Sequence, residues 1–242
     1  MLRNIILPDV HLDDKGYAPV YGVVKKFIKD FKPDIIYLLG DYADCSALSH
    51  WSLAKAKRRK IEGKRHKTEI DIIKKELDYL QKYSKNIVWL EGNHENWVEQ
   101  YLDINAEMEG LAEYPVLLNL KDRNIKWIPQ GKLHKVGKLY MFHGKYVNTY
   151  HAKKHMEKFG CSIVYAHGHN SQTYTNNQVM QPTHKAWGLG CLCNKKPDYL
   201  KGIEGSWNHE FATQYIASNG DFNLYPVDIV NNRFFYNGKQ YS

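Results

Sequence analysis

Residues 35–44 read IIYLLGDYAD, an apolar run that ends in a glycine and two aspartates. Because Pro33 and Gly40 bound the run, it predicts a short buried strand of a parallel sheet. Two similar apolar runs, residues 4–7 and 87–90, predict strands on either side of it along the chain. The stretch and its two counterparts therefore favour an α/β fold with a mostly parallel sheet.

Helices are predicted between these strands, over residues 19–31 and 70–80, where apolar side chains recur at helical spacing. The second half has another pattern, with a helix near residues 152–159 and several short strands. Those strands cover residues 125–128, 133–136, 139–142, 163–166, 215–217, 223–230 and 233–236. We interpret this half as a second sheet packed on the first, and residues 1–242 as one domain with a basic insertion at about 45–67.

The composition is that of a folded chain with a local excess of positive charge. Of 242 residues, 43% are hydrophobic, which excludes a disordered chain. Residues 55–67 hold eight basic side chains and one acid, so they carry +7 of the total net charge of +8. Such a block is either a solvated face or a contact for an anionic partner.

No membrane segment is expected, because no apolar run approaches the ~18 residues that a spanning helix needs. The first strand meets Asp9 too soon for a signal peptide. The four cysteines form no CxxC pair and predict free thiols in a reducing cytoplasm. We interpret Cys191 and Cys193, which lie in an apolar stretch, as packing residues.

Five predicted strands each end in side chains that bind metals. These strand ends carry Asp9 and His11; Asp41 and Asp44; Asn93 and His94; His143; and His167 and His169. In α/β sheets, functional sites lie at the carboxyl ends of strands, where loops collect residues from distant parts of the sequence. Each motif alone is more often a turn or a surface feature, but their joint occurrence at five strand ends predicts a metal site. Asp9 and His11, and also His167 and His169, are two residues apart and would face one side of an extended backbone.

The ordered motifs DxH, GDxxD, GNH(D/E), a strand-end His and GHxH resemble the calcineurin-like metallophosphoesterase superfamily, over residues 9–169. Ala166 replaces the usual first glycine of GHxH, with both histidines kept. The resemblance implies a four-layer α/β/β/α sandwich of two mixed sheets, with a two-metal centre at its edge. It assigns Asp9, His11, Asp41 and His169 to metal one, and Asp41, Asn93, His143 and His167 to metal two. The basic segment and the late GLGCL stretch are similar to those of small phosphoesterases of bacteriophages and prophages.

The same resemblance gives roles to two further residues. His94 corresponds to the acid that protonates the leaving oxygen, and Asp44 to the carboxylate that orients this histidine. Two divalent cations ~3.5–4 Å apart can share a bridging hydroxide that attacks a phosphoester in line. Histidine and carboxylate ligands suit manganese, which we expect, with iron, zinc, nickel or cobalt as alternatives.

Two departures from the family pattern bear on the substrate. Protein phosphatases of this superfamily carry arginines where Cys45 and Glu91 stand here. We therefore expect a phosphodiesterase that acts on a nucleotide or nucleic acid, with His50, Arg58, Arg59 and Lys60 as substrate contacts. The alternatives are a phosphomonoesterase acting on proteins or small molecules, and a nucleic-acid-binding module with a silent metal site.

Overall fold

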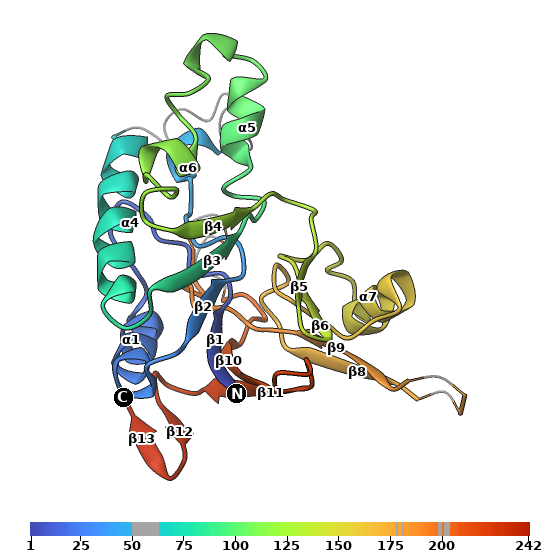
Figure 1. The fold of residues 1–242 in the computed structure, drawn as a ribbon. Coiled ribbons are helices and arrows are strands. Elements are labelled where there is room, and N and C mark those ends of the chain that lie inside the picture. The colour runs from blue at the N-terminus through green and yellow to red at the C-terminus, as the bar shows by residue number, and fades with distance from the viewer. Residues whose placement is uncertain (50–62, 178, 181, 198–199, 201–203) are drawn as a thin grey trace.

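Two β-sheets pack against each other in the computed structural model, which describes residues 1–49, 63–177, 179–180, 182–197, 200 and 204–242. Helices lie on the outer sides of both sheets (Figure 1). The layers therefore follow the order helix, sheet, sheet, helix. This arrangement confirms the predicted α/β/β/α sandwich of two mixed sheets.

The first sheet has a parallel centre and an antiparallel side. Within the described residues it contains, in spatial order, β11 (Phe222–Ile229), β10 (His209–Ile216), β1 (Leu2–Leu7), β2 (Ile35–Leu38), β3 (Asn86–Leu90) and β4 (Ile125–Ile128). Strands β1 to β4 are parallel, whereas β10 runs antiparallel to β1 and β11 antiparallel to β10. Since β1, β2 and β3 are parallel neighbours, their carboxyl ends lie at the same edge.

The second sheet consists of shorter strands. In the described chain its spatial order is β5 (His134–Val136), β6 (Leu139–Met141), β7 (Ile163–Tyr165), β9 (His184–Gly188) and β8 (Gln172–Asn176). Strands β6, β7 and β9 are parallel, and the two outer strands are antiparallel to their neighbours. A separate hairpin, β12 (Phe234–Tyr236) and β13 (Lys239–Tyr241), contacts the first helix of the chain.

The assignment of every late strand to the second sheet is wrong. Strands β4, β10 and β11 belong to the first sheet, where β4 extends the parallel set and β10 pairs with β1. Alternating polar and apolar residues identify a half-buried strand, but they do not identify the strand with which it pairs.

Helices α1 (Pro19–Phe31) and α4 (His66–Gln81) cover the outer face of the first sheet, and α7 (His151–Phe159) packs on the second (Figure 1). Proline at the first position of α1 costs no hydrogen bond, and Lys32 ends this helix with a left-handed φ of 47°. The connections after β2 and β3 contain η1 (Ser46–Leu48), α5 (Trp97–Leu102), η2 (Ala106–Met108) and α6 (Tyr114–Leu117). Within the described residues, no helix combines the length and apolar character needed to cross a bilayer.

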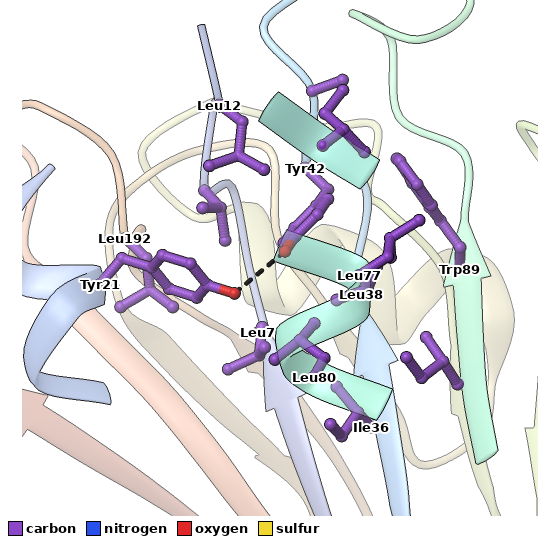
Figure 2. Close-up of a cluster of buried hydrophobic side chains, with 14 of the residues drawn as sticks. Leu7, Leu12, Tyr21, Ile36, Leu38, Tyr42, Leu77, Leu80, Trp89 and Leu192 are labelled. Carbon is purple, nitrogen blue, oxygen red and sulfur yellow. Dashed lines mark hydrogen bonds between the residues drawn. The ribbon is translucent and has the colours of Figure 1, made fainter. Parts of the chain in front are cut away.

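The largest core lies between the helices and the first sheet. Figure 2 shows Leu77 and Leu80 of α4 beside Leu38 of β2 in this cluster. The hydroxyl groups of Tyr21 and Tyr42 hydrogen-bond over 3.0 Å within it. Because Tyr21 belongs to α1 and Tyr42 to the loop after β2, this buried bond ties that loop to the helix.

A second core joins the two sheets, and a smaller one lies beneath α7. The core between the sheets includes Ile6, Tyr37, Leu39, Val88 and Leu90 from the first sheet, and Leu139, Met141, Val164 and Leu189 from the second. Apolar side chains thus fill both faces of β1, β2 and β3, which explains why these strands read as nearly continuous apolar runs. The packed sheets bring their strand ends to a common edge.

Candidate metal centre

The loops after β1, β2, β3, β6 and β7 meet at this edge of the two sheets. His11 N–H donates to the main-chain oxygen of Asp41 over 2.9 Å, and His167 N–H donates to the Asp9 carboxylate over 3.1 Å. The second of these bonds joins residues 158 positions apart. The site contains Asp9, His11, Asp41, Asp44, Asn93, His94, His143, His167 and His169. The structure therefore brings all seven predicted ligands and both predicted catalytic residues together.

Five of the predicted ligands have a left-handed backbone. The φ angles are 40° at Asp9, 50° at His11, 48° at Asp41, 72° at His167 and 57° at His169. This conformation costs a residue with a side chain about 1–2 kcal/mol. The extended backbone that we predicted for the two DxH-type pairs is therefore wrong, and left-handed turns aim these side chains instead. Backbone strain of this kind persists where the surrounding structure holds it, most often at functional sites.

Site one is formed by Asp9, His11, Asp41 and His169. His169 Nε2 lies 3.3 Å from His11 Nε2 and 3.3 Å from Asp9 Oδ1. Asp41 Oδ2 lies 3.9 Å from His11 Nε2. Asp9 is fully buried, and its Oδ1 accepts no hydrogen bond from the described residues. Ligand bonds of ~2.0–2.2 Å place neighbouring ligand atoms at about these separations, so the donor set fits a divalent cation.

Site two is formed by Asp41, Asn93, His143 and His167. His143 Nε2 lies 3.2 Å from Asp41 Oδ2 and 3.1 Å from Asn93 Oδ1, and ligand atoms of Asp41, His143 and His167 all lie within 4.8 Å of one another. His143 Nδ1 lies 3.0 Å from the main-chain oxygen of Leu39 and therefore donates to it, which leaves Nε2 free for a metal. Asp41 Oδ2 lies between the two sites, where a bridging carboxylate would stand.

The buried carboxylates of the centre favour positive charge on the groups around them. Burial alone would raise the pKa of the Asp41 carboxyl, but His143 and His94 hold it well below its usual range. Burial opposes a charge on His143, yet Asp41 outweighs it and raises the pKa of this imidazole to about 10. Burial lowers the pKa of His167 to about 4, which keeps that imidazole neutral, the form that binds metals. The site thus combines an ionised Asp41 carboxylate with a neutral His167, and His143 would give up its Nε2 proton when a cation binds.

His94 lies next to the predicted ligands, with a ring nitrogen within 4.8 Å of ligand atoms of His11 and Asp41. Its Nδ1 donates to the main-chain oxygen of Asp44 over 2.8 Å, and its Nε2 lies 4.0 Å from Asp41 Oδ2. The Asp44 carboxylate lies 3.5 Å from His94 Nδ1 and closer, 3.2 Å, to His11 Nδ1. The ring of Trp97 lies against His94, with centroids 4.0 Å apart. Asp44 therefore fixes the His94 tautomer mainly through its main-chain oxygen, and its carboxylate lies close to both His11 and His94.

Electrostatics keep His94 protonated at neutral pH. Burial lowers the pKa of this imidazole, but the Asp41 and Asp44 carboxylates outweigh it and raise the pKa to about 9. Bound cations would bring this pKa down towards neutrality, because they repel the imidazolium charge. Both conditions agree with a proton donor, the role that we predicted for His94.

Glu95 is a buried carboxylate beneath the centre, to which the motif analysis gave no role. Its two oxygens accept hydrogen bonds from the main-chain N–H groups of Asp41 (2.9 Å), Tyr42 (2.7 Å), Ala43 (3.0 Å) and Gly92 (2.8 Å), and from Trp89 Nε1 (3.3 Å). Glu95 thereby joins the loop after β2 to the loop after β3. A Cβ atom on Gly92 would lie 2.1 Å from Asp41 Oδ1, so this position requires glycine. The acid of the GNH(D/E) motif is the sequence signal for Glu95, but the motif does not reveal its partners.

The residues predicted to contact substrate, His50, Arg58, Arg59 and Lys60, lie outside the described residues, as does most of the basic segment. The described part resumes at Gly63, three residues before α4. Their role remains a prediction.

The chain matches one family model over residues 2–199, that of the calcineurin-like phosphoesterases. No protein with a curated description matches its sequence. Similar solved structures include Vps29 of Chaetomium thermophilum, with 12% identity, a TM-score of 0.49, and 96% of this chain and 93% of that chain covered. Another is the nuclease MPE of Pseudomonas putida, with 13% identity, a TM-score of 0.37, and 87% and 83% of the two chains covered.

Proposed function

Because the chain belongs to the calcineurin-like phosphoesterase family, whose members are metal-dependent phosphoester hydrolases, we propose that it is a dinuclear phosphodiesterase acting on a nucleotide or nucleic acid. The observation that carries this proposal is the pair of adjoining ligand sets that share Asp41. Two cations so placed are the arrangement used for in-line displacement at phosphorus.

The residues around the two sites have separate tasks in this proposal. When bound, the two divalent cations would activate a water molecule and neutralise charge on the phosphoryl group. Asp41 would hold both ions, and Asn93 would add a neutral oxygen that limits the negative charge at site two. His94, with Nδ1–H held by the Asp44 carbonyl, would give its Nε2 proton to the leaving oxygen.

The surroundings of the centre favour a diester over a monoester. A monoester dianion carries an additional charge that arginine usually binds. The two positions where family phosphatases carry arginine hold the buried Cys45 and Glu91, and Glu91 accepts the Gln130 N–H over 2.8 Å. Two arginines that the structure does describe are engaged elsewhere, Arg65 with the Lys64 carbonyl and Arg123 with Asp78.

A comparison of reporter substrates tests the proposal. With Mn²⁺ present, we expect kcat/KM for bis(p-nitrophenyl) phosphate to exceed that for p-nitrophenyl phosphate by about tenfold or more. This factor corresponds to the loss of one charged hydrogen bond to the monoester dianion. EDTA should abolish both activities, and added Mn²⁺ should restore them. Preference for the monoester would favour the phosphomonoesterase alternative. Two bound metals without cleavage of either ester would favour the nucleic-acid-binding alternative.

We further propose that the basic segment binds the polyanionic part of the substrate. Replacing Arg58, Arg59 and Lys60 with glutamine is expected to weaken binding of a single-stranded oligonucleotide. Each lost phosphate contact should reduce the slope of log K against log salt concentration by ~0.7. Turnover of bis(p-nitrophenyl) phosphate should stay near the wild-type rate, because this small ester lacks the row of phosphates that a basic segment binds. Fluorescence anisotropy at several salt concentrations measures the first effect.

A control with the same change of charge is available at the end of the parallel strands that lies opposite the predicted metal centre. Lys26, Lys29 and Lys32 are exposed there, on α1 and at its end, and their replacement removes the same charge. The control should keep the wild-type salt slope. Equal weakening by both triple variants would mean that net charge, and not this segment, determines binding.

A further inference from the structure

Two of the predicted histidine ligands have an oxygen partner for the ring nitrogen that faces away from the centre. For His143 the partner is the main-chain oxygen of Leu39 at 3.0 Å, and for His11 it is Asp44 Oδ1 at 3.2 Å. Metal-binding histidines almost always have such a partner, because it fixes the tautomer and the orientation of the ring.

His169 has a sulfur atom in this place. Cys193 Sγ lies 3.9 Å from His169 Nδ1, whereas Nε2 of the same ring faces Asp9 and His11 at site one. The Cys193 sulfur also falls within 4.8 Å of ligand nitrogens of both histidines. Only 5% of Cys193 is exposed, so water does not compete for the sulfur. The packing role that we expected for Cys193 does not explain this alignment with a ligand.

The backbone around Cys193 is fixed on both sides. Leu192 N–H donates to the main-chain oxygen of Asp9 over 3.1 Å, so the segment lies directly against a site-one ligand. His209 Nε2, at the start of β10, lies 2.9 Å from the main-chain oxygen of Cys193. Cys191, two residues before Cys193, is fully buried as well. The sulfur is therefore held in position before any metal arrives.

We propose that Cys193 is a positioning residue for site one, as the hydrogen-bond partner of His169. When His169 Nε2 binds a cation, the imidazole proton is on Nδ1 and is donated to the Cys193 sulfur. This inference rests on the proposed function, because it requires a metal at site one.

The chemistry of sulfur gives this arrangement a measurable property. A thiol is a weaker acceptor than the carbonyl or carboxylate oxygens that hold His143 and His11. His169 is then the least firmly anchored of these three histidines. Site one should therefore release its ion before site two when free metal is lowered.

Equilibrium dialysis against Mn²⁺, with the bound metal counted by mass spectrometry, tests the role of Cys193. We expect Cys193→Ala to weaken one of the two Mn²⁺ sites by about 10–100-fold, the usual effect of removing such a partner, and the other by less than twofold. Cys193→Ser keeps an acceptor and should recover most of the affinity. Cys161→Ala removes a thiol that precedes β7, at the opposite end of this strand from His167, and should match the wild type.

A second measurement does not depend on variants. In protein loaded with Co²⁺, a directly bound thiolate gives a strong near-ultraviolet charge-transfer band, whereas a partner of His169 gives none. Such a band in the wild-type protein would overturn the proposal by making Cys193 a ligand. Unchanged Mn²⁺ affinity in Cys193→Ala would also overturn it. So would equal losses of Mn²⁺ affinity in the Ala and Ser variants, if both variants also lost the same stability in EDTA. A wild-type chain that binds no Mn²⁺ would contradict the proposed function itself, while two Mn²⁺ sites with an unaffected Cys193→Ala would contradict this inference alone.

Discussion

Replacing His94 with alanine is expected to lower kcat by ~10²–10⁴-fold for a diester with an alkoxide leaving group, while both metals remain bound. The imidazole donates its Nδ1–H to the Asp44 carbonyl, and its Nε2 faces the centre. Its raised pKa, about 9 without metals, keeps the second proton available at neutral pH. Because an alkoxide leaves only when protonated, loss of this proton should affect the chemical step and not metal binding.

The leaving group provides an internal control for this variant. p-Nitrophenolate leaves without protonation, so His94→Ala should be impaired much less on bis(p-nitrophenyl) phosphate. His134→Ala removes a half-buried imidazole on β5 of the second sheet, which lies beside Tyr37 of the first, and it should retain the wild-type rate on both esters. A His94→Ala enzyme that keeps nearly full activity on the alkyl diester would show that another group supplies the proton.

Replacing Glu95 with alanine is expected to lower the free energy of unfolding by at least about 3 kcal/mol and to remove bound metal. Five N–H groups donate to this carboxylate, and each buried donor left unpaired costs about 1–3 kcal/mol. Asp41 would lose the bond that fixes its main chain in the left-handed conformation. Urea unfolding in EDTA measures the stability, and mass spectrometry measures the Mn²⁺ retained.

Glu210 offers a matched control for the loss of a buried carboxylate. It is also almost fully buried and lies on β10, but it accepts hydrogen bonds from Gly190 N–H (3.1 Å) and Ser171 Oγ (2.9 Å), which are not part of the Asp41 loop. Glu210→Ala should therefore lose less stability than Glu95→Ala and keep its Mn²⁺. If the two variants lose equal stability and Glu95→Ala still binds two metals, Glu95 does not organise the centre.

The parallel part of the fold was predictable because its strands are buried on both faces. The run at residues 35–39, for example, packs against α4 on one side and the second sheet on the other, and the sequence shows this as unbroken apolarity. Helix α1 was predicted with its observed bounds, since its proline and its apolar spacing are local signals. The pairing of β10 with β1 was not predictable, because the choice of partner depends on contacts between residues some 200 positions apart.

The predicted ligands meet because each follows a strand whose position is fixed by the sheets. Residues that hold the ligands in place are harder to identify from the sequence. Glu95 acts through main-chain N–H groups, which every residue type offers, so no motif reports its partners. Cys193 reaches His169 only after the loop at residues 191–193 packs against Asp9. The left-handed turns at the ligands also went unpredicted, because Asp and His do not signal this conformation as glycine does.

Strand β10 lies beside β1 in the finished sheet, with Ile216 opposite Leu2. On a ribosome, β1 emerges before β10, and the edge that β10 covers stays unpaired until residues 209–216 have been added. An open strand edge is a template for pairing between chains, so the nascent protein passes through a period in which aggregation competes with folding. All seven predicted ligands have been synthesised by residue 169, yet the strand that closes their sheet has not. The first sheet is thus completed late in translation, although the predicted ligands are made early.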